Sequence, residues 1–186
     1  MRIIGGQFKS RLIDMPKGVD IRPTQDRVRE AVFNILADIS GRRVLDLFAG
    51  SGAFGIESVS RGAAHATFVE NNFRCAHTIK SNLSSLDIPD GAYDIIKTNA
   101  LSVMPRLARA VERFDLIFLD PPYYQDMAKK SLISLDSHDI LSQTGLVVVE
   151  HSRKDTLASD LRTLVLDKER KYGDTMITIY RKVAHA

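Results

Sequence analysis

The chain has 186 residues, of which 44% are hydrophobic and 26% are charged, with a formal net charge of +3 and a pI near 9.0. Its length is typical of one domain that buries its own core. This composition excludes disordered, collagen-like and coiled-coil chains, and the mild positive charge is compatible with a polyanionic partner.

Membrane insertion and export are not expected. The longest aliphatic or aromatic runs, Leu116–Leu119 and Leu146–Val149, have four residues each, whereas a membrane-spanning helix needs about 20. The first residues contain no apolar stretch of signal-peptide length. Because Cys75 is the single cysteine, no internal disulfide can form, so we expect a reducing, cytoplasmic compartment.

The first 20 residues differ in character from the rest. Ile3-Ile4, Gly5-Gly6 and residues 8–15 predict a short β-hairpin. Alternate strand residues share a face, so Lys9 and Arg11 would point the same way, and no acid lies within residues 1–11.

A helix is predicted after Arg22-Pro23-Thr24. Its apolar face would be formed by Val28, Val32, Ile35 and Ile39, which recur at helical spacing. Thr24 would be either the N-cap of this helix or a ligand of the bound molecule, and the sequence leaves both open.

From residue 43 the chain alternates predicted strands and helices. Strands are expected at 43–48, 65–70, 93–97, 114–119 and 145–150, and helices near 53–61, 73–86, 101–111 and 126–141. This rhythm predicts βαβ units with a parallel sheet. Residues 164–171 and 175–181 flank Gly173-Asp174 and predict an antiparallel hairpin that closes one sheet edge. The expected fold is α/β, a Rossmann-like sheet of about seven strands with helices on both faces.

A glycine loop follows the first of these strands. Gly50, Gly52 and Gly55 satisfy G-x-G-x-x-G, and Glu70 lies 20 residues after Gly50, which is the dinucleotide fingerprint. Asp46, however, would repel a diphosphate and attract a ligand that carries a cation, such as S-adenosylmethionine. Glu70 could accept hydrogen bonds from a ribose diol. The alternatives are a tight turn that binds nothing and a nicotinamide cofactor.

The fourth strand is followed directly by Asp120-Pro121-Pro122-Tyr123. In this fold type ligands bind at the carboxyl ends of the strands, where the winding direction reverses. Two acceptors, the Asp120 carboxylate and the Pro121 carbonyl, could bind both N–H groups of an exocyclic amine and expose its lone pair. The prolines would stiffen the loop, and the Tyr123 ring could stack on a flat base. The alternative is an ordinary turn.

These segments together resemble a known family. The chain resembles class I S-adenosylmethionine-dependent amino-methyltransferases with a D/N-PP-Y motif, and more closely the bacterial 16S rRNA guanine-N2 methyltransferases called RsmD. The resemblance rests on MRIIGGQFKSR at 1–11, RPTQDRVREAVFNIL at 22–36, VLDLFAGSGAFGIES at 44–58, FVE at 68–70, DPPY at 120–123 and VVVEHS at 147–152.

The resemblance implies a function and a set of site residues. It implies methylation of a guanine N2 amine in 16S rRNA, either naked or in the assembling small subunit. Asp120, Pro121, Pro122 and Tyr123 would hold the target amine. The cofactor would be held by Asp46, Phe48, Gly50, Gly52, Glu70, Asn99 and Ala100, with the last two at the adenine.

The RNA contacts are predicted from charge. Lys9 and Arg11 have no acid beside them, whereas Arg22, Arg27 and Arg29 are weaker candidates because Asp26 and Glu30 are close. Basic clusters such as Lys129-Lys130 are expected to be solvated. The chain is expected to be one monomeric domain, with an RNA-contacting hairpin and helix at 1–40 and the catalytic core at 41–186.

Several readings stay open. The histidines form no metal-binding pattern, so no metal site is expected. His151 could face the crevice or be a satisfied strand-end residue. Competing functions are methylation of DNA or of a protein glutamine, an NAD-dependent oxidoreductase, and a ribosome assembly factor without catalytic activity.

Overall fold

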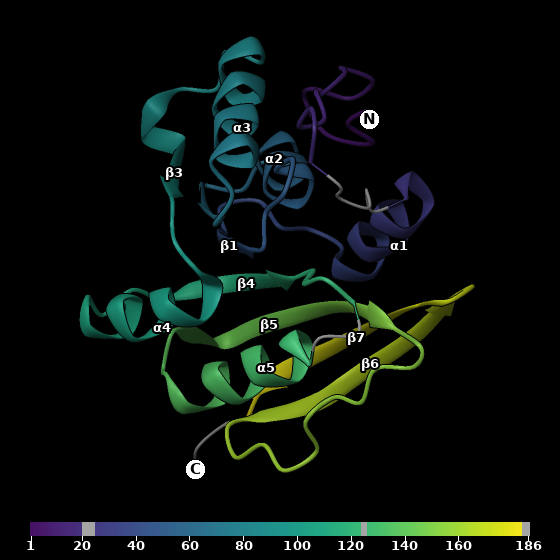
Figure 1. Cartoon of the computed structure of the whole chain (residues 1–186), viewed down its shortest axis with the longest axis vertical. Helices are drawn as coiled ribbons and strands as arrows, with labels where there is room; N and C mark the ends of the chain where they lie inside the picture. The colour runs from purple at the N-terminus through teal and green to yellow at the C-terminus, as the bar shows by residue number, and fades with distance from the viewer. Residues whose placement is uncertain (20–24, 124–125, 184–186) are drawn as a thin grey trace. The chain divides into compact units, whose positions relative to one another are not determined.

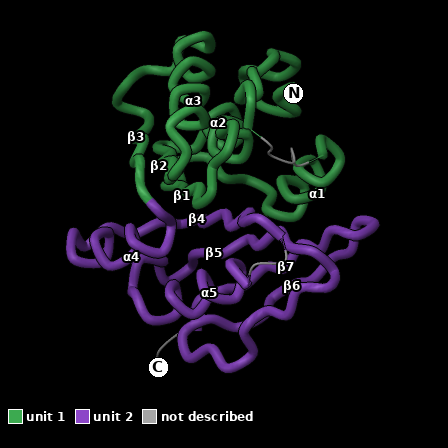
Figure 2. Tube along the Cα trace, in the orientation of Figure 1, with its two compact units in different colours: residues 1–98 green, residues 99–186 purple. Residues whose placement is uncertain are grey.

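The computed structural model describes residues 1–19, 25–123 and 126–183 (Figure 1). The chain divides into two compact units, Met1–Thr98 and Asn99–Ala186 (Figure 2). The described residues contain seven strands, three in unit 1 and four in unit 2. Among these residues, no helix combines the length and the apolar character needed to cross a bilayer.

Unit 1 alternates helices and parallel strands. Its elements are α1 (Asp26–Leu36), β1 (Arg43–Leu47), α2 (Ala53–Ser60), β2 (His65–Val69), α3 (Phe73–Ser85), the 3-10 turn η1 (Asp90–Ala92) and β3 (Tyr93–Ile96). The strand order is β3-β2-β1, and both pairs are parallel. The predicted βαβ units are confirmed, and they bring the carboxyl ends of the three strands to one edge of this sheet.

Unit 2 begins with alternating helices and parallel strands and ends with antiparallel strands. Its elements are α4 (Ala100–Arg109), β4 (Phe114–Leu119), α5 (Met127–Ser137), β5 (Leu141–Ser152), β6 (Leu164–Tyr172) and β7 (Thr175–Lys182). The strand order is β4-β5-β7-β6, with β4 and β5 parallel and the other two pairs antiparallel. The predicted C-terminal hairpin is confirmed, and Gly173 supplies its turn with a φ of 64°.

Two helices end several residues before the predicted end, and β5 begins at Leu141 and not at residue 145. The last helix ends at Ser137 and not at residue 141, because His138 is extended and Leu141 already pairs with Phe114 in the sheet. The first helix ends at Leu36, because Ala37 has a φ of 57°. Ile39 is therefore outside the helix, although it is still buried.

The predicted N-terminal hairpin is present in a short form. It has one antiparallel bridge, between Arg2 and Leu12, flanked by hydrogen bonds of 2.9 Å from Ile3 N to Arg11 O and from Ile13 N to Met1 O. Backbone groups between the two arms bind α2: Ile4 N and Gly5 N donate to the Glu57 carboxylate, and Gln7 N donates to Ser60 O. The segment is thus fastened to unit 1.

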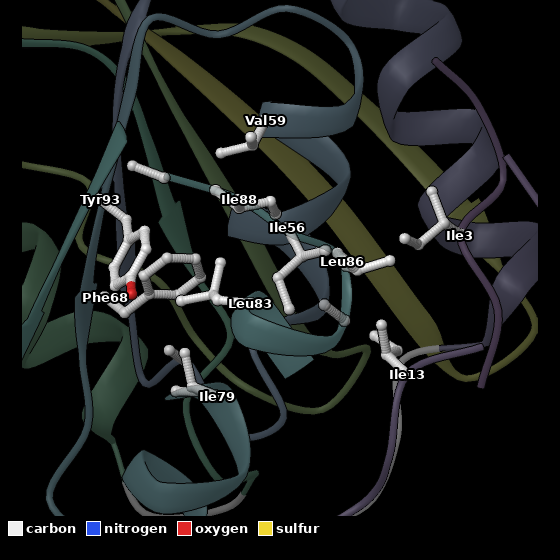
Figure 3. Packing of buried hydrophobic residues seen from close by; sticks show 13 residues of the cluster. Ile3, Ile13, Ile56, Val59, Phe68, Ile79, Leu83, Leu86, Ile88 and Tyr93 are labelled. Carbon is white, nitrogen blue, oxygen red and sulfur yellow. The ribbon is translucent and has the colours of Figure 1, made fainter. Parts of the chain in front are cut away.

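A hydrophobic cluster fills unit 1 (Figure 3). It joins Ile3 and Ile13 of the N-terminal segment to side chains of α2, β2 and α3 (Figure 3). Gly55 on α2 allows a close approach here, since a Cβ at this residue would lie 2.2 Å from Phe68 Cε1. The third glycine of the motif therefore serves helix–strand packing, as in other folds of this type.

Candidate active site

The loop after β1 has an unusual backbone. Phe48, Gly50 and Gly52 have φ values of 65°, 56° and 82°, in the left-handed region. Gly52 is also the N-cap of α2. Glycine adopts this conformation without steric cost, whereas Phe48 does so at a cost, and such costs are concentrated at functional loops. No sequence pattern predicted the positive φ of Phe48.

Asp46 lies beneath this loop. Its side chain is 1% exposed, and Oδ2 accepts a hydrogen bond of 2.9 Å from Gly55 N. The carboxylate therefore fastens the first turn of α2 to β1. A buried negative charge at this place disfavours a diphosphate and suits a cationic ligand, as the sequence indicated.

Glu70 joins the glycine loop to the end of β2. Its Oε2 accepts from Gly50 N at 2.8 Å, and its Oε1 accepts from Asn72 N at 2.7 Å. A carboxylate offers about four acceptor positions, so a ribose diol could bind as well. The structure brings Glu70 and Gly50, two predicted cofactor residues, together, and their cofactor roles stay predictions.

Asn99 and Ala100 begin α4. Asn99 is the exposed N-cap, and its Oδ1 accepts from Leu101 N at 2.9 Å, whereas Ala100 is buried. The cap engages the amide oxygen, so a contact with an adenine would use the amide NH2 group. The predicted adenine role is compatible with this geometry and stays a prediction.

The Asp120-Pro121-Pro122-Tyr123 loop follows β4 directly in unit 2. Tyr123 is half-buried, and its hydroxyl donates to Glu150 Oε1 at 3.1 Å and lies 3.1 Å from Thr175 Oγ1. Burial raises the pKa of Tyr123, so the phenol stays protonated. Neither partner was predicted from the sequence; Glu150, the acid within VVVEHS at 147–152, was the available signal.

His151 lies inside β5 and is buried. The side chain is 5% exposed. Its Nδ1 lies 2.9 Å from Ser152 O, and its Nε2 lies 2.9 Å from Thr178 Oγ1. Burial lowers the pKa of His151. Both ring nitrogens therefore have partners within unit 2, which supports a satisfied strand histidine.

The predicted RNA contacts have different surroundings. Lys9 and Arg27 are exposed, whereas Arg11, also exposed, donates through Nη2 to Ser85 O at 2.8 Å. Arg22 and Thr24 lie outside the described residues, and the N-cap of α1 is Gln25.

Arg29 is not available to RNA, so its inclusion was wrong. It is 1% exposed and pairs with Asp26 at 3.1 Å. Arg29 comes two residues after the exposed Arg27, and two residues rotate a helix by about 200°. The two side chains therefore lie on opposite faces of α1, with Arg29 on the buried face. In the described part of the chain, no group of three or more His, Cys, Asp or Glu residues could hold a metal ion.

Comparison with known proteins finds relatives that match nearly the whole chain. A family model described as "Conserved hypothetical protein 95" matches residues 1–181. The Bacillus subtilis (strain 168) protein YlbH is 38% identical over 98% of this chain and 99% of its own. "Ribosomal RNA small subunit methyltransferase D" of Escherichia coli (strain K12) is 34% identical over 99% of this chain and 91% of its own. The chain belongs to the RsmD family.

The solved structures agree with the fold. The Escherichia coli protein yhhF is 32% identical, has a TM-score of 0.83 and is matched over 100% of this chain and 99% of that chain. The Rossmann-like methyltransferase fold is therefore confirmed. Because the family match begins at residue 1, the N-terminal segment belongs to the domain that these proteins share.

Proposed function

We propose that this protein transfers a methyl group from S-adenosylmethionine to the exocyclic N2 amine of a guanine in 16S rRNA. The observation that carries this proposal is the Asp120–Tyr123 loop, in which an acid and two prolines follow a buried strand and the tyrosine is anchored through its hydroxyl. The name of the Escherichia coli relative supports the ribosomal small subunit as the source of the substrate.

The proposed cofactor contacts of unit 1 lie at the carboxyl ends of β1 and β2. Glu70 would bind the ribose hydroxyls, the Gly50–Gly52 loop would allow close approach, and Asp46 would favour the cationic methionine end. Phe48, Asn99 and Ala100 are further proposed cofactor contacts. S-adenosylmethionine, when bound, supplies an electrophilic methyl group on sulfur. The buried Asp46 is also the reason to prefer it to a nicotinamide dinucleotide.

The target amine would be prepared by the loop after β4. An exocyclic amine is a poor nucleophile because its lone pair is delocalised into the ring. The Asp120 carboxylate and the Pro121 carbonyl would accept its two N–H bonds and favour a pyramidal nitrogen. Tyr123 would stack on the guanine, so that positioning provides most of the rate enhancement. The methylated amine is acidic, and it would lose its proton without a strong base.

The RNA would be gripped by exposed cations of the N-terminal part. Lys9, Arg11, Arg22 and Arg27 are the proposed phosphate contacts, in a monomeric cytoplasmic protein. The competing substrates, DNA and a protein glutamine, share the planar amine or amide chemistry of the loop. The family membership favours rRNA over both.

Calorimetric titration with S-adenosylhomocysteine and NADH tests the cofactor. We expect the wild type to bind the first and not the second. Glu70→Gln should weaken that binding about tenfold or more, because hydrogen bonds to a charged acceptor contribute about 1.5–3 kcal/mol. Asp120→Ala should bind S-adenosylhomocysteine normally and lose methyl transfer to RNA. Binding of NADH alone, or full activity of Asp120→Ala, would contradict the proposal.

A further inference from the structure

Tyr123 is fastened to two neighbouring strands. Glu150 lies on β5 and Thr175 on β7, and these strands are paired antiparallel. The side chains of Glu150 and Thr175 are 6% and 4% exposed. The Tyr123 hydroxyl thus lies among buried polar side chains of the strands β5 and β7 of unit 2.

The two contacts form a directed chain. A phenol has one proton to donate, and a carboxylate only accepts hydrogen bonds. The Tyr123 hydroxyl therefore donates to Glu150 Oε1, and the Thr175 hydroxyl donates to the Tyr123 oxygen. The O–H bond of a phenol lies close to the ring plane, because the oxygen lone pair is conjugated with the ring. Two partners consequently fix the tilt of the ring as well as the place of its oxygen.

We propose that Glu150 and Thr175 are positioning residues that set the plane of the Tyr123 ring for the target base. This inference rests on the proposed function, in which that ring stacks on the guanine. A ring held before binding loses no rotational freedom when the base arrives. The sheet, and not the loop alone, would then determine the orientation of the base relative to Asp120.

A double-mutant cycle on the methylation of 16S rRNA tests this inference. Glu150→Gln and Tyr123→Phe should each lower kcat about three- to tenfold, the range expected for one side chain that must be ordered on binding. The double variant should be no slower than Tyr123→Phe, because Glu150 acts through the hydroxyl. The affinity for S-adenosylhomocysteine should not change. Glu169→Gln, a strand carboxylate that contacts Thr178, is the control and should keep the wild-type kcat.

Two further measurements keep the inference falsifiable if Glu150→Gln does not fold. Thr175→Ser retains the hydroxyl and should keep kcat, whereas Thr175→Val should lower it. Ring-flip rates from NMR of labelled tyrosine should be slow for Tyr123 in the wild type and faster in Thr175→Val. Independent, multiplicative losses in the cycle, or a freely flipping wild-type ring, would overturn the inference. A slow ring in a wild type that does not methylate 16S rRNA would instead contradict the proposed function.

Discussion

Glu57 on α2 is a buried carboxylate with several donors. It is 1% exposed, and it accepts from Ile4 N and Gly5 N at 2.8 Å and from Arg61 Nε at 2.7 Å. Arg29 Nε lies 3.8 Å from it. Burial lowers the pKa of Arg29, and the charge of Glu57 opposes that shift. One residue thereby ties the N-terminal segment and α1 to α2.

Removing this carboxylate should be costly. Glu57→Ala leaves the buried Arg29 without its partner on α2, and breaking a buried pair from one side costs about 3–5 kcal/mol. Urea unfolding should show this loss in the free energy of unfolding. Glu30→Ala, at an exposed residue of α1, should change it by no more than about 0.5 kcal/mol. Equal effects of the two variants would contradict the structural role of Glu57.

The candidate residues that lie within short sequence motifs were predictable from the sequence. Gly50 and Glu70 meet because each follows one strand of the parallel pair β1 and β2. The residues of the Asp120–Tyr123 loop are neighbours in the sequence. Glu150 and Thr175 were not found, because they lie 27 and 52 residues from Tyr123. Arg29 was misjudged for a related reason: a charged helix residue is usually solvated, and its buried partner comes from another helix.

At the scale of elements, the periodic segments were predictable, whereas the N-terminal segment was predictable only in part. Each strand from β1 to β4 lies within a residue or two of its expected range, since buried parallel strands are apolar runs bounded by turn residues. The two arms of the N-terminal segment pair as a short hairpin, but Ile4 N and Gly5 N between them bind the side chain of Glu57. Side-chain competition for backbone groups leaves no periodic trace in a sequence.

The pairing of β5 and β7 should be sensitive to pH through His151. Its folded-state pKa is lowered below 6.5 by burial, so the unfolded chain binds more protons below about pH 6.5. The contribution of neutral His151 to the free energy of unfolding is complete above that pH and is lost as the pH falls toward the folded-state pKa. The free energy of unfolding should therefore fall between pH 7 and pH 5, and His151→Gln should reduce that slope.

Urea unfolding at several pH values measures this effect. His77→Gln, at an exposed residue of α3, is the control and should keep the wild-type slope. A wild-type slope in His151→Gln would show that other groups cause the pH dependence.

For the whole molecule, the charge of +3 is small, so RNA affinity should depend on where the cations lie. If Lys9 and Arg27 contact phosphates, the double change to alanine should weaken binding and lower the slope of log K against log salt by about one to two. Titration of an rRNA fragment at several salt concentrations measures this slope. Lys129→Ala/Lys130→Ala, on exposed residues of α5, removes the same charge and should have little effect. Equal slopes for the two pairs would place the RNA elsewhere.

The most direct test of the account is nucleoside analysis after methylation. Small-subunit rRNA would be incubated with the protein and methyl-labelled S-adenosylmethionine, digested, and separated by chromatography with mass detection. We expect the label in N2-methylguanosine alone with the wild type, and none with Asp120→Ala. Label in another nucleoside, or equal labelling by Asp120→Ala, would contradict the central claim.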